Sequence, residues 1–378
     1  MEKRRISPRP NWKQKVESTG FAYHTFDGET YWDESAYYIF SESEIEEIET
    51  ATAEIQRLYI EAAEHIIGNR RFDELRIPHE FTSLIIQSWN RDDPSLYGRF
   101  DLRYDGKSPP RLFEYNADTP TGLFEASAIM WFWLKDVFPE CDQFNSIHEK
   151  LIESWKDCSK SSTIHFACAR DSLEDLGNLE YLRDTAIQAG FSTHRIFMDE
   201  IGYRVARNDF VDMEGREIQT IFKLYPWEWL LREEFGKYLN TCGWDIIEPA
   251  WKMLWSNKAI LPILYELNPG HPNLLRASFR QEDLHGFDYV EKPVFAREGA
   301  NVRIHAGPRS LSQGGPYGEE GFIFQEFLPL PEFNGRFPVI GSWIIGGEPA
   351  GIGMREDSTL ITSNDGTFVP HIIQKGVL

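Results

Sequence analysis

The chain has 378 residues, with 39 Lys and Arg against 60 Asp and Glu, which gives a formal net charge of −21 at pH 7. This acidic balance disfavours nucleic acid and anionic lipid as partners, and it attracts cations. A hydrophobic content of 41% with 12 Trp, 15 Tyr and 26 Phe suffices for sizeable cores and argues against a disordered chain.

The sequence indicates neither a membrane span nor a secretory route. The longest uninterrupted apolar run, residues 128–134, is far shorter than the roughly 20 residues that a span requires. Residues 1–5 lead into polar sequence, so we expect no signal peptide. The cysteines lack Cys-x-x-Cys spacing, which argues against a disulfide scaffold or a zinc site. We therefore predict a cytoplasmic protein without a membrane partner.

A long helix is expected near the amino terminus. Ser41 and Glu44 form a capping-box pattern, and apolar residues follow at helical spacing as far as Gly68. The pattern predicts a helix over residues 42–69.

Two strands that form a hairpin come next. Residues 96–104 alternate between apolar and charged side chains, as expected for a half-buried strand. Asp105 and Gly106 mark a turn, and residues 111–116 supply the second strand.

This hairpin places four polar side chains on one face. With the turn centred between residues 107 and 108, Asp101 lies opposite Glu114 and Arg99 lies opposite Asn116. Directly opposed carboxylates repel each other unless a cation lies between them. Asp101, Glu114 and the amide oxygen of Asn116 match the oxygen ligands that Mg²⁺ prefers. Two alternatives stay open here, a solvated hairpin face and a diagonal salt bridge between Arg99 and Glu114.

A helix is expected to begin beside this face. Asp118 followed by Pro120 is typical of a helix start, and residues 124–138 are apolar enough for a buried helix. The free N–H groups of its first turn, with Thr119 and Thr121, would bind a carboxylate or phosphate. A capped helix without a ligand is the alternative.

The middle of the chain alternates between helices and short strands. This alternation predicts a parallel sheet with βαβ connections. The expected helices are residues 142–157 and 173–189, and the expected strands are residues 163–168, 193–198 and 218–224.

Strands and tight turns dominate the last part of the chain. Lys292 lies within an apolar strand, where an unpaired ammonium is costly, and residues 296–301 follow as a short loop. Lys258 precedes an apolar helix at residues 260–267, a position that an ordinary surface lysine also occupies. The remaining expected elements are a buried strand at residues 321–327 and a hairpin at residues 337–355.

Five unusual blocks occur in the order RFD (99–101), EYNADTPT (114–121), NKAILPILYELNPGHPNLL (257–275), VEKPVFAREGANV (290–302) and GPYGEEGFIFQEF (315–327). This order resembles the synthetase portion of bacterial glutathionylspermidine synthases and their stand-alone homologues, which lack the amidase domain. The resemblance runs nearly end to end. Members of this family are ATP-grasp ligases, which join a carboxylate to an amine through an acyl phosphate.

The resemblance implies an α+β chain with an ATP-grasp fold and a smaller parallel α/β substrate lobe. The fold would be permuted, because the metal carboxylates precede the nucleotide lysines in the chain. By resemblance, residues 1–378 form one catalytic unit. Within it, residues 160–250 form the parallel substrate lobe and residues 251–330 form the nucleotide-binding lid lobe.

The resemblance also assigns roles in the metal-phosphate site. Asp101, Glu114 and Asn116 take the Mg²⁺ positions, and Arg99 takes the position that holds the transferred phosphoryl group. A planar guanidinium suits that role, because it neutralises charge spread over several oxygens. The residues that match small hydroxyl, substrate-binding positions are Thr119 and Thr121.

The nucleotide contacts are implied in the same way. Lys258 and Lys292 match the two lysines that reach the phosphates, and the strand at residues 321–327 would pass the adenine ring. The other implied contacts are Arg297, Gly299, Gln325, Glu326, Phe327 and Arg355.

We therefore predict an ATP- and Mg²⁺-dependent ligase that joins a peptide carboxylate to a polyamine or another amine. The acidic net charge agrees with a cationic acceptor. The alternative is an ATP-binding regulatory or interaction protein that kept the fold and lost turnover.

Overall fold

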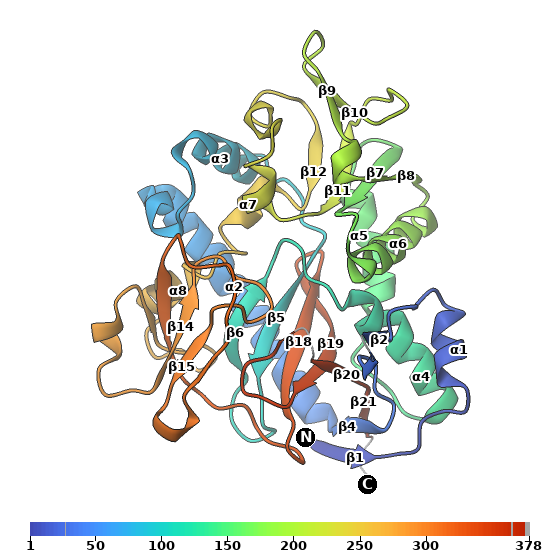
Figure 1. The fold of residues 1–378 in the computed structure, drawn as a ribbon, viewed down its shortest axis with the longest axis vertical. Helices are drawn as coiled ribbons and strands as arrows, with labels where there is room; N and C mark the ends of the chain where they lie inside the picture. The colour runs from blue at the N-terminus through green and yellow to red at the C-terminus, as the bar shows by residue number, and fades with distance from the viewer. Residues whose placement is uncertain (27, 364–365, 375–378) are drawn as a thin grey trace.

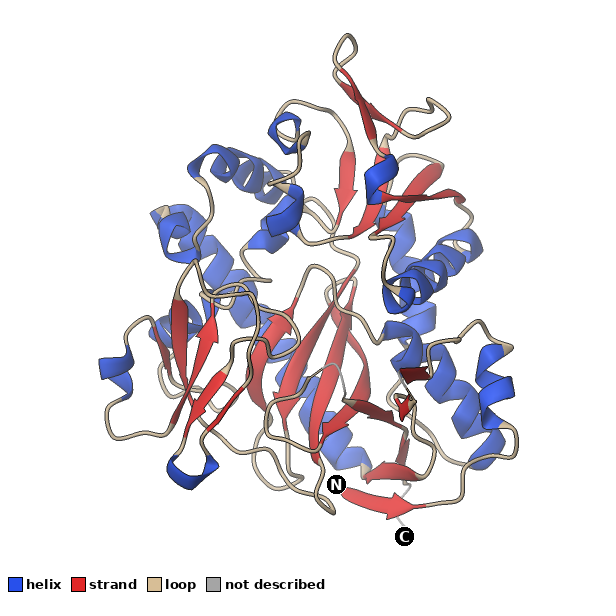
Figure 2. Cartoon of the chain, viewed as in Figure 1, coloured by secondary structure: helices blue, strands red, loops and turns tan. Residues whose placement is uncertain are grey.

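Three main sheets form the frame of the structure, and Figure 2 shows them as separate groups of strands. The computed structural model describes residues 1–26, 28–363 and 366–374. Within these ranges, every helix is either too short or too polar to cross a membrane.

The longest helix, α2 (Glu42–Asn69), lies behind the central sheet in Figure 1. The expected capping box fixes its start. Glu44 N donates to Ser41 Oγ at 3.2 Å, and Ser41 N donates to Glu44 Oε2 at 2.9 Å. Residues on its inner face, such as Ile48 and Ile55, are fully buried, so packing against the sheet stabilises the helix.

The central sheet is antiparallel and has the order β20-β19-β18-β5-β6. The two predicted hairpins form this sheet, because the strand at residues 337–345 pairs with the first strand of the earlier hairpin. Its strands are β5 (Tyr97–Arg103), β6 (Arg111–Asn116), β18 (Phe337–Ile345), β19 (Glu348–Asp357) and β20 (Thr367–Val369).

The predicted register of the first hairpin is confirmed where the candidate site lies. Asp101 faces Glu114, and Arg99 faces Asn116. A bulge follows directly after Asp101 and shifts the pairing toward the turn. Bulges of this kind re-aim side chains beside functional sites.

The predicted parallel sheet is also confirmed, with the order β12-β11-β7-β8. Its strands are β7 (Thr163–Cys168), β8 (Ser192–Phe197), β11 (Thr220–Leu224) and β12 (Asp245–Ile247). Helix α5 (Ile147–Cys158) precedes β7, and α6 (Leu173–Gln188) connects β7 to β8.

Helix α5 begins later than the expected residue 142. Asp142 forms a bridge with Ile373, and Asn145 forms a bridge with Gly351. These pairings hold residues 142–145 in an extended conformation, which the local sequence pattern does not reveal.

The third sheet has the order β13-β17-β14-β15-β16 and carries the predicted lysine strand. Helix α8 (Ile260–Leu267) packs beside it, as the apolar pattern predicts. Its strands are β13 (Ala277–Ser278), β14 (Tyr289–Pro293), β15 (Arg303–His305), β16 (Leu311–Ser312) and β17 (Phe322–Glu326).

The remaining elements cover the ends and edges of the three sheets. They are β1 (Glu2–Arg5), α1 (Trp12–Glu17), β2 (Thr25–Phe26), β3 (Glu29–Thr30), β4 (Ala36–Phe40), α3 (Thr82–Asn90), α4 (Met130–Val137), β9 (Gly202–Arg204), β10 (Asp209–Val211), α7 (Trp227–Leu230) and β21 (His371–Ile373).

A buried ion pair joins the hairpin to the parallel sheet. Asp118 Oδ1 accepts from Lys223 Nζ on β11 at 2.7 Å, and Asp118 Oδ2 accepts from Trp227 N at 2.8 Å. Both charged side chains are nearly inaccessible to solvent. Asp118 is therefore not the N-cap of the helix that follows it, as its sequence context suggested, but a contact between the end of the hairpin and the parallel sheet.

We expect Asp118→Asn to lower the free energy of unfolding by roughly 3–5 kcal/mol, because it leaves Lys223 buried without its counter-charge. Urea-induced unfolding measures the change. Asp283→Asn serves as the control, since Asp283 pairs with Arg280 at the surface and should leave stability unchanged. Equal stability of Asp118→Asn and the wild type would show that the pair does not hold the two sheets together.

Candidate active site

One cavity of about 540 Å³ opens where the three sheets meet. Its walls come from the hairpin β5–β6, from the segments that follow β7 and β11, and from β14 with the loop after it. Every residue singled out from the sequence lines this cavity, namely Arg99, Asp101, Glu114, Asn116, Thr119, Thr121, Lys258, Lys292, Arg297, Gly299, Gln325, Glu326, Phe327 and Arg355.

Arg99 is held in place by three hydrogen bonds. Its Nε and Nη2 donate to the two oxygens of Asp101 at 2.7 and 3.1 Å, and its Nη1 donates to Thr121 O at 2.6 Å. Asn116 Nδ2 donates to the same carboxylate at 3.0 Å. Burial disfavours the charge on Arg99, but Asp101 outweighs burial and raises the pKa of the guanidinium. The guanidinium is therefore charged and oriented before any substrate binds.

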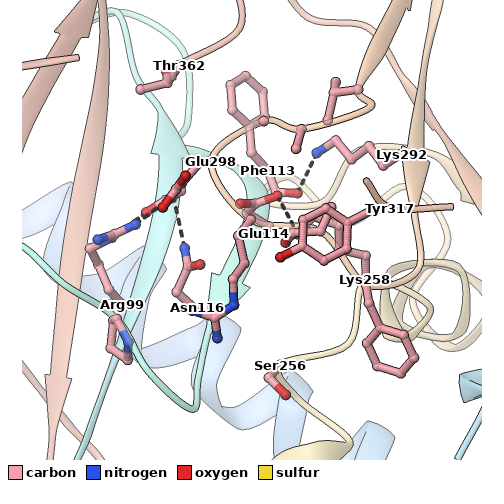
Figure 3. Close-up of a pocket in the computed structure, with 18 of the residues that line it drawn as sticks. Arg99, Phe113, Glu114, Asn116, Ser256, Lys258, Lys292, Glu298, Tyr317 and Thr362 are labelled. Atoms are coloured by element: carbon pink, nitrogen blue, oxygen red, sulfur yellow. Dashed lines mark hydrogen bonds and ion pairs between the residues drawn. The ribbon is translucent and has the colours of Figure 1, made fainter. Parts of the chain in front are cut away.

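Two lysines surround Glu114 on the other side of this face (Figure 3). Lys258 Nζ lies 3.4 Å from Glu114 Oε2 and donates to Ala296 O at 2.7 Å. Lys292 Nζ donates to Phe113 O at 3.0 Å. Burial opposes ionisation of Glu114, but the two lysines outweigh it and lower the pKa of the carboxyl. Burial lowers the pKa of Lys292 to about 8, so the nearby carboxylates offset only part of the cost of burying this ammonium.

The opposed carboxylates each have a cationic partner within the protein. Asp101 pairs with Arg99 on its own strand, and Glu114 pairs with Lys258. These two pairs form in place of the diagonal salt bridge between Arg99 and Glu114. The donor set nevertheless fits Mg²⁺, because it offers two carboxylates and an amide on one face, and Asn116 uses its nitrogen toward Asp101.

The expected anion site at the helix start is wrong in part. The helix begins at Leu123, and the N–H groups of Leu123 and Phe124 both donate to Asn178 Oδ1, at 3.0 and 3.4 Å. These donors are therefore not free for a ligand. Thr119 and Thr121 do face the cavity, and Thr119 Oγ1 accepts a hydrogen bond from Arg297.

The loop after β14 contacts Lys258 through Ala296 O and packs closely against Ile361. Gly299 has φ of +70°, and a Cβ atom there would lie 2.6 Å from a methyl carbon of Ile361. Only glycine fits this close approach without strain. Arg297 reaches across the cavity from this loop, where its Nε lies 3.9 Å from Glu228 Oε1.

The third sheet forms an apolar wall of the cavity. Gln325 is buried and its Nε2 donates to Leu112 O at 3.3 Å. The N–H groups of Glu326 and Phe327 donate to Arg276 O and Asp288 O. These groups therefore already have partners within the protein. The apolar side chains of this wall include Val290, Val302, Ile304 and Leu330.

Arg355 lines the cavity from β19. Its Nη2 donates to Ser363 O at 2.9 Å, and its guanidinium lies 5.8 Å from the centre of the Phe368 ring. Arg355, which was predicted to lie near the phosphate site, is thus one of the residues that line the cavity.

Sequence reasoning missed an acidic wall of the cavity. Glu174 and Asp175 lie in the first turn of α6, and Glu228 follows β11 in α7. Burial raises the pKa of Asp175 to about 6 and also raises that of Glu228. Acidic residues directly after an N-cap such as Ser172 are common in helices, where they interact favourably with the helix dipole. The sequence therefore does not indicate that Glu174 and Asp175 line a cavity.

A further carboxyl group, that of Glu125, lies behind the acidic wall. Glu125 is fully buried and begins a π-helical turn at Glu125–Ile129, a distortion that often marks functional sites. Tyr31 Oη donates to Glu125 Oε1 at 2.8 Å and lies 3.3 Å from Glu174 Oε1. Burial, with a smaller contribution from Glu174, raises the pKa of Glu125 to about 8.

This carboxyl should make stability depend on pH. The pKa of Glu125 is higher in the folded state than its ordinary value of 4.5, so its contribution is complete below about pH 4.5 and is lost as pH rises through about 8. As pH rises through this interval, the melting temperature of the wild type should therefore fall by more than about 2 °C relative to that of Glu125→Gln.

Differential scanning calorimetry from acid to alkaline pH measures this difference. Glu49→Gln, at an exposed position of α2, is the control and should follow the wild type at every pH. A constant difference between Glu125→Gln and the wild type would contradict the raised pKa.

A family model described as "Glutathionylspermidine synthase preATP-grasp" matches residues 3–374. The chain belongs to this family, whose curated relatives bear the names of carbon–nitrogen ligases. It is 39% identical to a Haemophilus influenzae protein named "Putative acid–amine ligase", over 96% of this chain and 97% of that protein.

Two longer relatives match over part of their length. The chain is 30% identical to trypanothione synthetase of Crithidia fasciculata, over 82% of this chain and 52% of the relative. It is 27% identical to the bifunctional glutathionylspermidine synthetase/amidase of Escherichia coli, over 90% of this chain and 59% of the relative. The chain thus spans little more than half of these two proteins.

A solved structure shares the fold. A glutathione synthetase-like effector from Globodera pallida superposes with a TM-score of 0.55 at 9% identity, covering 89% of each chain. The two chains therefore share a mixed α/β fold.

Proposed function

We propose that the chain is an ATP- and Mg²⁺-dependent carboxylate–amine ligase that forms an amide through an acyl phosphate. The observation that carries the proposal is the convergence of Arg99, Lys258 and Lys292 with the Asp101–Glu114 carboxylate pair in one cavity. Such a set of groups suits phosphoryl transfer, in which catalysis consists of positioning and charge neutralisation.

The metal and the phosphates would lie on the hairpin side of the cavity. Asp101, Glu114 and Asn116 would hold Mg²⁺, which supplies charge neutralisation to the phosphate oxygens. Lys258 and Lys292 would bind the same oxygens and thereby gain the compensation that Lys292 lacks in the free protein.

The nucleotide base would lie against the apolar wall of the third sheet. Phe327 and the aliphatic residues there offer a dry surface, and Gln325 and Glu326 lie at its edge. Arg297 and Gly299, from the loop, would cover the phosphates. Arg355 would contribute positive charge to the phosphate end from β19.

Arg99 would act on the reacting groups. The carboxylate oxygen of the donor attacks the γ-phosphorus of ATP, the bond to ADP breaks, and the amine then displaces phosphate from the acyl carbon. A fixed guanidinium stabilises the charge that spreads over the transferred phosphoryl oxygens. Thr119 and Thr121 would hydrogen-bond the donor substrate beside it.

The substrates would be a peptide carboxylate and a polyamine or another amine. The names of the relatives support a peptide donor and a polyamine acceptor. The wall formed by Glu174, Asp175 and Glu228 supports a cationic acceptor, because these carboxyl groups line the same cavity. We assign the enzyme to the cytoplasm, because the proposed reaction consumes ATP.

The arrangement of the sheets also supports a permuted ATP-grasp fold. We assign residues 160–250 to the substrate lobe and residues 251–330 to the nucleotide lid, both within one catalytic unit. The placement of all predicted groups around one cavity favours turnover over a silent ATP-binding protein.

We expect Asp101→Asn and Glu114→Gln to reduce Mg-ATP-dependent phosphate release at least about 100-fold, because each removes a metal carboxylate. A phosphate assay with glutathione and spermidine measures the effect. Glu291→Gln is the matched control, since Glu291 lies on β14 but pairs outward with Arg303. Wild-type turnover in both site variants, with folding unchanged, would rule out the metal assignment.

Arg99 and Lys292 should affect different kinetic constants. We expect Arg99→Ala to lower kcat at least about 100-fold with little change in KM for ATP, because the guanidinium acts in the transition state. Lys292→Ala should mainly raise KM for ATP. Steady-state kinetics with varied ATP separates the two effects, and an interchange of the two results would refute the assigned roles.

A further inference from the structure

Amide formation from an ammonium requires a group that accepts its proton. At neutral pH a primary amine carries a positive charge and has no lone pair for attack on the acyl carbon. Asp101 holds Arg99 in its charged form, and the proposed function assigns Lys258 and Lys292 to the phosphates. Asp101 and Glu114 are paired with cations, so the candidates for the acceptor are the other carboxylates around the cavity.

Glu174 and Glu125 are linked through one hydroxyl group. Tyr31 Oη lies 3.3 Å from Glu174 Oε1 and 2.8 Å from Glu125 Oε1. Glu174 lines the cavity, whereas Tyr31 and Glu125 lie behind it and are almost fully buried. Because Tyr31 Oη donates to Glu125 Oε1, this oxygen is the one that would receive a proton from Tyr31.

We infer that Glu174, Tyr31 and Glu125 form a proton-accepting relay for the amine substrate. The inference rests on the proposed ligase function. Glu174 takes a proton from the ammonium, and Tyr31 receives that proton and passes its own hydroxyl proton to Glu125 in its carboxylate form, whose fraction grows as pH rises toward about 8. The freed nitrogen lone pair forms the C–N bond, and the C–O bond to phosphate breaks. The second N–H proton leaves with the phosphate.

The groups around Glu125 suit this role. Tyr23 and Tyr31 face it from the amino-terminal segment, Glu174 faces it from α6, and Arg355 acts on it from β19. Burial and Glu174 raise its pKa to about 8, whereas Arg355 has the opposite effect. A general base is most effective when its pKa is near the operating pH.

The test compares two nucleophiles that attack the same acyl phosphate. Spermidine is cationic and needs the relay, whereas hydroxylamine is uncharged at neutral pH and needs no base. With glutathione as the donor, we expect Glu174→Gln and Glu125→Gln to lower the ratio of amide to hydroxamate by about a hundredfold. Tyr31→Phe should lower it in the same direction. A structural defect would reduce both products together.

The control variant is Glu180→Gln, on the same helix as Glu174 but paired with Arg183 and Arg195 instead of facing the cavity. It should keep the wild-type ratio. An unchanged ratio in both Glu174→Gln and Glu125→Gln would overturn the relay. A wild-type protein that makes neither product would contradict the ligase function itself, and hydroxamate without amide would contradict the relay for a polyamine.

Infrared spectroscopy provides a measurement that does not depend on turnover. Titration of the wild type from about pH 7 to about pH 10 should convert a buried carboxylic acid band into carboxylate bands with a midpoint near pH 8. Asp175, whose pKa is about 6, has largely ionised before this interval. We expect the conversion near pH 8 to be absent in Glu125→Gln and retained in Glu180→Gln. The same midpoint in Glu125→Gln would show that another group titrates there and would overturn the role of Glu125.

Discussion

Compensation of charge inside the cavity is the constraint on which the rest of the structure depends. Asp101 and Glu114 face each other across two strands, and like charges at that position destabilise a sheet. Arg99 and Lys258 neutralise them, and each cation is itself buried. An unpaired buried charge costs far more free energy than a surface charge, so each side chain must be delivered to its partner.

This requirement explains why separate sheets meet at one place. The central sheet supplies the carboxylates and Arg99, the third sheet supplies Lys292, and Lys258 comes from the segment before α8. Asp118, just beyond the hairpin, then ties the parallel sheet to the same point through Lys223. The cavity consequently has a cationic side near the hairpin and an acidic side on the parallel sheet. We propose that the two sides separate the anionic phosphates from the cationic amine.

Local patterns in the sequence predicted the elements that depend on neighbouring residues. The alternation in residues 96–104 predicted both the strand and the facing pairs of the hairpin, because side chains in a strand alternate strictly. The capping box at Ser41 predicted the start of α2 for the same local reason.

Contacts between distant parts of the chain were not predictable in this way. Asp118 looked like a helix cap, yet its partner Lys223 lies 105 residues away. Asn178 takes the N–H groups that seemed free for an anion. The Tyr31 bridge between Glu125 and Glu174 joins three segments whose individual patterns are those of ordinary core and helix residues. Such contacts are set by packing of whole elements, and a single sequence carries no periodic signal for them.

The central claim is that the donor carboxylate becomes an acyl phosphate, and transfer of an oxygen isotope tests it most directly. Glutathione labelled with ¹⁸O in its carboxylates would be incubated with the protein, Mg-ATP and spermidine, and the released phosphate would be examined by mass spectrometry. Since the donor oxygen becomes the bridge to phosphorus and leaves with the phosphate, the account predicts one ¹⁸O atom in each phosphate formed during amide synthesis. Amide formation that releases only unlabelled phosphate would contradict the account.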